Sequence, residues 1–292
     1  MKKIIKKTAD GNRYCLTTQN FWVRDITTEG VPFVDINKTI SSEDYFTFLQ
    51  NEVQNGMERN AWIDTESFDM RKVVIVSDGY DFENKIRLLE KLPKDVTIIG
   101  VNGALTKWSL SNRNLNWYVV NNPYDECMRF LPRRNRTLPR CIFSPRTNSK
   151  FISAYKSVKY KYYPVNEKAY CTLGKNEVAW QVDDYRNPIC AAITLAYRFG
   201  VEKIMLLCCD DSFKTERPGS QLLENGLYQY PQQSIAHGII DNMFYWIKNH
   251  PIYDYDIADH SSGQKFENAT YIDEEGFLPF FNKVGEKNEK ME

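Results

Sequence analysis

The stretch Arg71-Lys72-Val73-Val74-Ile75-Val76-Ser77-Asp78-Gly79 decides the fold of this chain. Its apolar, β-branched centre follows two cations, and a small polar turn comes directly after it. A short apolar run without polar alternation is typical of a strand that is buried on both faces of a parallel sheet. The polar turn predicts that the strand ends at Ser77.

Outward from this strand, apolar runs alternate with helical patterns along the chain. The predicted elements are, in chain order, a helix at 82–92, strands at 96–101 and 117–120, a helix at 189–199, a strand at 204–209 and a helix at 233–249. Such alternation predicts an α/β fold in which helices cover both faces of a parallel sheet. We therefore expect a Rossmann-like domain over residues 71–260.

Two further regions flank this predicted domain. Residues 1–70 indicate a small N-terminal appendage, with a hairpin within 13–35 and a helix that opens at Ser41-Ser42-Glu43-Asp44. A hydroxyl side chain followed by acidic residues is a common start of a helix. Residues 261–292 are expected to form a C-terminal extension that ends in a polar tail.

Composition limits the classes of function. The 292 residues carry 38 Lys and Arg against 38 Asp and Glu, and this zero net charge excludes a generally basic nucleic-acid coat. With 42% hydrophobic residues, the chain can bury a substantial core. No apolar run reaches the ~20 residues of a membrane span, and the N-terminus lacks a secretory signal. The seven Cys form no disulfide or zinc pattern, so we expect a cytoplasmic protein.

Small polar residues follow the predicted strands where these end. The pairs are Asp78-Gly79, Asn102-Gly103, Asn121-Asn122 and Asp210-Asp211. Because ligands of parallel α/β sheets bind beyond the carboxyl ends of the strands, these residues predict a binding site. Asn, Asp and Gly are also ordinary turn formers, and that alternative stays open. Neither a Walker A sequence nor G-x-G-x-x-G is present, which argues against P-loop phosphoryl transfer and dinucleotide hydride transfer.

A basic and aromatic stretch extends from Arg129 to Tyr163. It contains ten Lys and Arg and no acidic residue, interleaved with Phe and Tyr. Such a stretch suits a polyanion, including single-stranded nucleic acid, which binds by charge and base stacking. It also suits a sugar-nucleotide pyrophosphate or an anionic glycan. The competing interpretation is a solvated loop whose aromatic side chains are anchored in the core.

Three segments resemble a known family. Residues 117–124, 187–211 and 236–253 are similar in spacing and hydrophobicity to the bacterial single-Rossmann sialyltransferases. The segment Val101-Asn102-Gly103-Ala104-Leu105 also resembles the motility-accessory-factor and hydroxymethylpterin-pyrophosphokinase-like proteins. The resemblance covers residues 71–260. It implies a glycosyltransferase that takes a nucleotide-sugar, with a CMP-sugar favoured, and a glycan or other hydroxyl acceptor.

The resemblance also implies roles for single residues. The general base would be His237, a residue type whose pKa lies near neutrality, and Tyr228 or Tyr230 would stabilise the leaving group. The nucleotide would be held by residues at the strand ends and at one helix start, namely Asp78, Gly79, Asn102, Gly103, Asn121, Asn122 and Asn187.

Two alternative functions stay open. Asp210 and Asp211 are weak candidates for a Mg²⁺ site, which would fit a Mg-dependent pyrophosphokinase that acts on a pterin-type alcohol. The other alternative is a non-catalytic Rossmann module that binds nucleic acid or a protein partner through residues 129–163. The sequence also leaves a homo-oligomer open.

Overall fold

A computed structural model describes residues 5–7, 13–16, 22–24, 42–57, 61–63, 70–108, 111–132, 137–164, 181–182, 184, 187–210, 212–249 and 255–282. The chain forms two compact units, which divide between Ile40 and Ser41. In the first unit, the antiparallel strands pair in the order β1 (Ile5–Lys7), β2 (Arg13–Leu16) and β3 (Trp22–Arg24). The pair β2–β3 lies within the predicted hairpin, and the other residues of that segment are outside the described ones.

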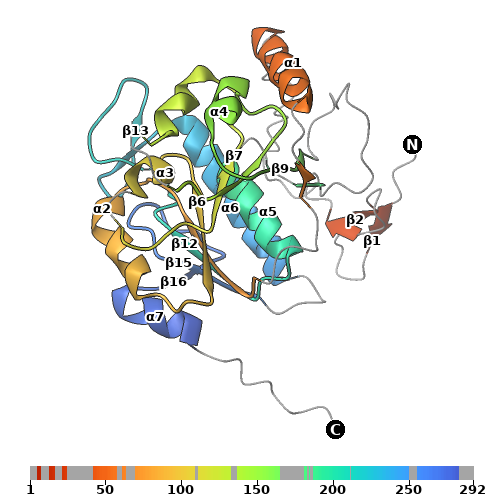
Figure 1. Ribbon diagram of the computed structural model, residues 1–292. Helices are drawn as coiled ribbons and strands as arrows, with labels where there is room; N and C mark the ends of the chain where they lie inside the picture. Colours follow the sequence, from red (N-terminus) through yellow and green to blue (C-terminus); the bar gives the residue numbers. More distant parts are fainter. Residues whose placement is uncertain are drawn as a thin grey trace. The chain divides into compact units, whose positions relative to one another are not determined.

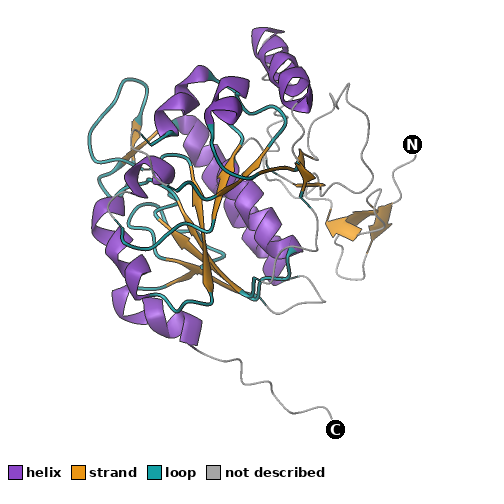
Figure 2. Cartoon of the chain, viewed as in Figure 1, coloured by secondary structure: helices purple, strands orange, loops and turns teal. Residues whose placement is uncertain are grey.

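The second unit is built around a sheet of nine strands (Figures 1 and 2). In spatial order these are β16 (Thr270–Tyr271), β15 (Asp256–Asp259), β12 (Lys203–Leu207), β5 (Lys72–Val76), β6 (Val96–Val101), β7 (Trp117–Val120), β8 (Arg140–Phe143), β9 (Lys159–Lys161) and β4 (Ala61–Trp62). Every neighbouring pair runs parallel. The predicted α/β, Rossmann-like fold is therefore confirmed.

The strand β5 lies inside the sheet, where the direction of chain progress reverses. From β5 the chain moves outward through β6, β7, β8 and β9, and it then returns to add β12 on the opposite side of β5. The apolar residues of β5, Val73 to Val76, are fully buried. This burial agrees with the two-faced strand that the sequence predicts.

Helices cover both faces of the sheet (Figure 1). One face packs against α5 (Pro188–Arg198) and α6 (Pro231–Lys248). The other packs against α2 (Phe82–Lys85), a 3₁₀ helix (Ile86–Lys91), α3 (Ala104–Lys107), a 3₁₀ helix (Asp125–Phe130), α4 (Ser149–Ala154) and α7 (Glu274–Asn282). The predicted helix at 82–92 is thus a short α-helix that continues as a 3₁₀ helix. Short strands also pair as β10 (Tyr163–Pro164) with β11 (Gln181–Val182), and β13 (Gln221–Leu222) with β14 (Tyr228–Gln229).

The helix α5 begins and ends on local sequence signals. The side-chain oxygen of Asn187 accepts a hydrogen bond from the Ile189 nitrogen at 2.8 Å, and Pro188 occupies the first turn. Gly200 ends the helix with a φ of 71°, which an L side chain rarely adopts. The helix is therefore fixed with its N-terminus at the edge where the strands end.

Segments outside the predicted central domain belong to the larger unit. The helix α1 (Ser42–Met57) packs against α4, and β4 pairs with β9. At the other end of the chain, β16 pairs with β15, and α7 buries Phe277 and Phe281. None of the described helices is both long enough and apolar enough to cross a bilayer.

Candidate functional site

A pocket of about 230 Å³ lies at the carboxyl ends of β6, β7 and β8. Its wall includes residues that follow these strands and β11, with others from α1, the 123–126 segment and the start of α5. They are Asn102, Asn121, Asn122, Ser144, Arg146, Asp184, Phe48, Pro123, Tyr124, Glu126 and Pro188. Pockets for drug-sized ligands usually enclose ~300–1,000 Å³. This one therefore suits a single ring with its substituents.

Three of the predicted nucleotide-binding residues share this pocket. Asn102 has a φ of 50°, and its backbone oxygen accepts a hydrogen bond from the Tyr118 hydroxyl at 2.9 Å. The buried amide of Asn121 donates to Asp184 Oδ2 at 3.4 Å. The side-chain oxygen of Asn122 accepts from the Tyr124 nitrogen at 2.9 Å, as a turn former does. These residues line the pocket, and one of them is also a turn former, so the two interpretations do not exclude each other.

Asp184 is a pocket residue that the sequence analysis missed. Its Oδ2 atom accepts a hydrogen bond from the Tyr162 hydroxyl at 2.7 Å, in addition to that from Asn121. Burial and the charge of Asp184 raise the pKa of Tyr162 well above its ordinary value, so the hydroxyl stays protonated and donates the hydrogen bond. These two donors fix the orientation of the carboxylate.

Arg146 is the only Lys or Arg among the described residues that line the pocket. Its Nε atom lies 3.6 Å from Glu52 Oε2, and its guanidinium lies 5.8 Å from the centre of the Phe48 ring. Pro188, at the start of α5, lines the same pocket, and a helix N-terminus carries partial positive charge. This part of the pocket therefore favours an oxygen-rich or anionic group.

Two aromatic side chains line the pocket, of which Tyr124 is exposed and Phe48 is buried. Tyr124 is 41% exposed, and its ring centre lies 6.4 Å from that of Phe48 at an interplanar angle of 58°. An exposed aromatic face of this kind can pack against a planar base or the apolar face of a sugar.

The turn after β5, which contains Asp78 and Gly79, lies beside the pocket and is not part of its wall. The Gly79 nitrogen donates to the Cys208 oxygen at 3.1 Å, and a Cβ at Gly79 would lie 2.5 Å from that oxygen. Asp78 Oδ1 accepts from the Gly103 nitrogen at 3.1 Å. Asp78, Gly79 and Gly103 therefore join the ends of neighbouring strands, while Asn187 caps α5.

Asp210, at the end of β12, is buried, and Asp211 lies outside the described residues. Burial raises the pKa of Asp210 to about 6, and its Oδ2 atom accepts a hydrogen bond from Ser212. Among the described residues, no three His, Cys, Asp or Glu side chains gather as metal ligands would. The magnesium site stays a prediction.

His237 lies on α6 and is not among the residues that line the pocket. Its ring stacks on Phe266 at 4.0 Å, and Nε2 is 3.2 Å from the Gln264 oxygen. Burial lowers the pKa of His237, which favours the neutral imidazole. Tyr228 and Tyr230, both half-buried, are also absent from the wall. The pocket thus brings together three of the predicted asparagines, Asn102, Asn121 and Asn122, without the predicted base or tyrosines.

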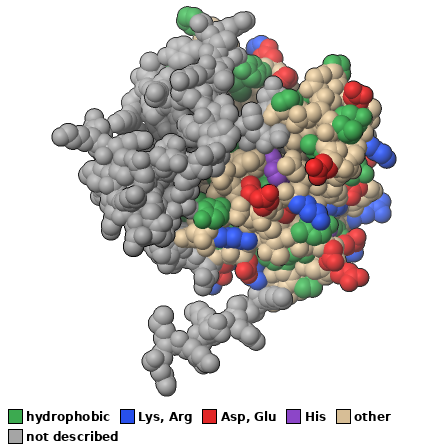
Figure 3. Space-filling view, turned by 180° about the vertical axis from the view of Figure 1, so that it is seen from behind, with side chains coloured by type: hydrophobic (Ala, Val, Ile, Leu, Met, Phe, Trp, Pro, Cys, Tyr) green, Lys and Arg blue, Asp and Glu red, His purple; other side chains and the backbone are tan. Residues whose placement is uncertain are grey.

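The basic stretch contributes mainly to the core and to local ion pairs. Phe143, Phe151, Tyr155 and Tyr162 are buried, so they offer no open faces for base stacking. Lys150 pairs with Asp125 at 2.6 Å, and residues 133–136 lie outside the described ones. On the face shown in Figure 3, acidic and basic side chains are interspersed over the described part of the chain.

The sequence matches no protein-family model and no curated protein. The fold resembles a Maf glycosyltransferase. The solved structure of that protein, from Magnetospirillum magneticum AMB-1, matches 80% of this chain with a TM-score of 0.57 and 12% identity. The match covers 38% of the Maf protein. The predicted resemblance to motility-accessory factors is confirmed for the fold, whereas the sialyltransferase and pterin-kinase resemblances stay predictions.

Proposed function

We propose that this protein is a glycosyltransferase that moves a sugar from a nucleotide-sugar donor to an acceptor hydroxyl. The observation that carries the proposal is the gathering of Asn102, Asn121, Arg146 and Asp184 around one pocket beyond the strand ends. The likeness of fold to a Maf glycosyltransferase supports this class of reaction. A CMP-sugar is the favoured donor because of the sialyltransferase resemblance in the sequence.

The lining of the pocket suits the parts of such a donor. Amide side chains both donate and accept hydrogen bonds, as sugar hydroxyls and pyrimidine edges require. Arg146 and the N-terminus of α5 favour the phosphate or a sugar carboxylate. The rim tyrosine, Tyr124, offers a face for a ring. At about 230 Å³ the pocket holds one portion of the donor, and the rest would extend beyond the rim.

The transfer itself needs a proton acceptor. The acceptor oxygen attacks the anomeric carbon while its proton passes to a base, and the bond from that carbon to the phosphate oxygen breaks. The electron pair of the broken bond leaves with the nucleotide, whose growing negative charge is stabilised by nearby donors. We assign the base to Asp184 because its carboxylate lies in the pocket wall. His237 is the competing assignment.

Calorimetry with CMP, UDP and GDP tests the binding half of the proposal. We expect CMP to bind, and the variant Asn121→Ala to weaken binding by about tenfold, the equivalent of one hydrogen bond to a charged or well-fixed group. Asn249→Ala, at the C-terminal end of α6, is the matched control. Failure of all three nucleotides to bind at millimolar concentration would remove the proposal.

Turnover of a CMP-sugar separates the two candidate bases. Loss of a general base usually slows the chemical step by about 10²–10⁴-fold. We expect the rate of nucleotide release to fall by this factor in Asp184→Asn and by much less in His237→Asn. The reverse ranking would assign the base to His237. Turnover at the wild-type rate in both variants would exclude both residues as the base.

A further inference from the structure

One face of α1 is directed at Arg146. Phe48 and Glu52 are four residues apart, a spacing that places side chains on the same face of a helix. The Arg146 guanidinium lies over the Phe48 ring at 5.8 Å, and its Nε atom is 3.6 Å from Glu52 Oε2. The same helix therefore supplies both an aromatic face and a counter-charge to the pocket cation.

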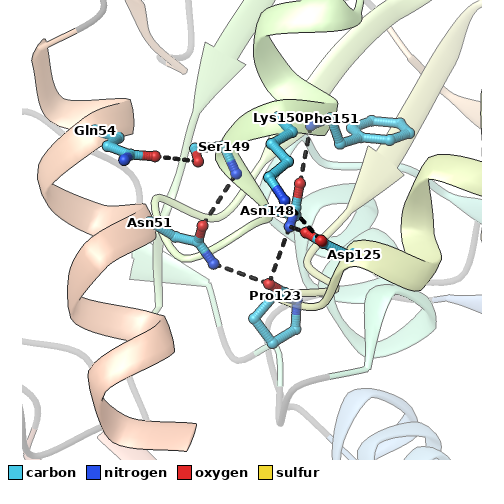
Figure 4. A network of polar contacts seen from close by, with 8 residues as sticks. All are labelled: Asn51, Gln54, Pro123, Asp125, Asn148, Ser149, Lys150 and Phe151. Carbon is cyan, nitrogen blue, oxygen red and sulfur yellow. Dashed lines mark hydrogen bonds and ion pairs between the residues drawn. The ribbon is translucent and has the colours of Figure 1, made fainter.

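Amide side chains tie α1 to the loop that carries Arg146. Asn55 Nδ2 donates to the backbone oxygens of Pro145 at 2.7 Å and Thr147 at 2.6 Å. Asn51 Nδ2 donates to the Arg146 oxygen at 3.2 Å and to the Pro123 oxygen at 2.9 Å. Figure 4 shows Asn51 between Pro123 and Ser149, the first residue of α4, whose nitrogen donates a hydrogen bond to the Asn51 side-chain oxygen.

The burial of Glu52 is the informative observation. Its side chain is 1% exposed, and neither carboxylate oxygen accepts a hydrogen bond from any described group. At 3.6 Å, Arg146 attracts this carboxylate by charge without a hydrogen bond from Nε. A buried carboxylate is costly unless a cation opposes it. Arg146 supplies the opposing charge, so burial of Glu52 depends on the close approach of the two side chains, which points to a role for Glu52 in placing that cation.

We propose that Glu52 is a positioning residue, which holds the Arg146 guanidinium at the pocket wall to bind the anionic group of a ligand. The identity of that ligand rests on the proposed function; the geometry of the pair does not. The group is a phosphate or a carboxylate. Arg146 and the start of α5 attract it, while Glu126 and Asp184 repel it from the rest of the pocket, so its place in the pocket is defined.

The first test measures whether Glu52 fixes the position of the Arg146 side chain in the ligand-free protein. In ¹⁵N NMR spectra of the full chain, the Arg146 Nε–H signal is assigned by its absence in Arg146→Lys. We expect a resolved, slowly exchanging signal that persists in the control Glu83→Gln, which removes an exposed charge on α2. In Glu52→Gln this signal should shift or exchange rapidly, and Glu52→Asp, which keeps the charge, should partly restore it. An unchanged signal in a folded Glu52→Gln chain overturns the proposal.

The second test measures the affinity for pairs of ligands, in which one member carries an anionic group and the other is neutral. The pairs are CMP with cytidine for a phosphate and glucuronate with glucose for a carboxylate. We expect Glu52→Gln to weaken one anion by about tenfold and to leave its neutral partner unchanged; the anion affected identifies the group. Equal or tighter anion binding overturns the proposal, because Glu52 would then only neutralise Arg146. A wild-type chain that binds none of the four removes the proposed function, and the Arg146 signal still decides the role of Glu52.

Discussion

Two parts of the same sheet edge differ in packing. Beyond β6, β7 and β8 the chain leaves a pocket lined by Asn102 and Asn121. Beyond β5, β12 and β15 the described residues pack closely. There Asp210 is 1% exposed, and a side chain at Gly79 or Gly263 would collide with neighbouring atoms. The first part is the open edge, and the second is the closed edge.

The comparison teaches that residue type alone does not make a site. Both edges carry Asn, Asp or Gly close to the strand ends, with Asn102 and Asn121 at the open edge and Asp78, Gly79 and Asp210 at the closed edge. Among the described residues, the non-glycine residues with positive φ, Asp81, Asn102 and Cys208, follow β5, β6 and β12 and so belong to both edges. Positive φ therefore marks the strand ends in general and does not distinguish the two edges.

The largest expected effect comes from forcing a side chain into the closed edge. Gly79→Val should lower the free energy of unfolding by about 3 kcal/mol, because the added atoms would meet the Cys208 backbone. Urea denaturation measures the change. The control Gly238→Ala, in a helix with no atom within 4 Å of the new Cβ, should raise stability by about 0.5–1 kcal/mol. A valine tolerated at position 79 would show that this edge is not closed.

The pH dependence of stability probes the buried charges of the closed edge. Burial raises the pKa of Asp210 from 3.8 to about 6, and the charges of Asp259 and Lys85 also act on it. A raised pKa stabilises the fold below pH 3.8, and this stability is lost as the pH rises through about 6. The loss is about 2–3 kcal/mol.

Denaturation from pH 4 to pH 7.5 should show this decline in the wild-type chain. In Asp210→Asn most of the decline should disappear, and Asp259, whose pKa burial also raises, should leave a smaller one of the same sign. If the stability of Asp210→Asn fell with pH as much as that of the wild-type chain, another group would be responsible for the titration.

At the open edge, binding should change while stability does not. Tyr124→Ala removes the exposed rim ring, so we expect CMP affinity to fall by about tenfold. The free energy of unfolding should change by less than about 1 kcal/mol. Tyr271→Ala, which removes a similarly exposed tyrosine from β16, is the control and should leave CMP affinity unchanged. Equal CMP affinity in Tyr124→Ala and Tyr271→Ala would show that the Tyr124 ring does not contact the ligand.

The smallest effect is expected for Lys150, in the basic stretch. Its ion pair with Asp125 is largely exposed, so Lys150→Ala should change stability by less than about 1 kcal/mol. We also expect CMP affinity to stay constant, since Lys150 does not line the pocket. A measurable loss of single-stranded nucleic-acid binding in this variant would instead favour the polyanion alternative.

The sequence predicts the strands that carry four apolar residues and misses those that carry fewer. β5, β6, β7 and β12 are recognisable because their residues are buried on both faces. β8, which begins at Arg140, and β9, with the sequence Lys159-Tyr160-Lys161, are hidden in the basic stretch. With so few apolar residues among charged neighbours, neither strand leaves the apolar run on which such predictions depend.

The missed pocket residues follow from the missed strands. Had β8 been recognised, the rule that finds Asn102 and Asn121 would also have found Ser144 and Arg146. Asp184 follows the two-residue strand β11, which is too short to leave a pattern. Glu52 and Phe48 come from a helix that the sequence separates from the main fold, so only tertiary packing shows their place at the pocket.

The strand order has a consequence for synthesis on the ribosome. β5 ends at Val76, and β12, which covers one of its edges, begins only at Lys203. While the intervening residues emerge, the most apolar strand of the sheet keeps a row of hydrogen-bonding groups uncovered. Such an edge can recruit another nascent chain. Fragments that stop before residue 203 are therefore expected to be insoluble, even though they hold every strand on the pocket side.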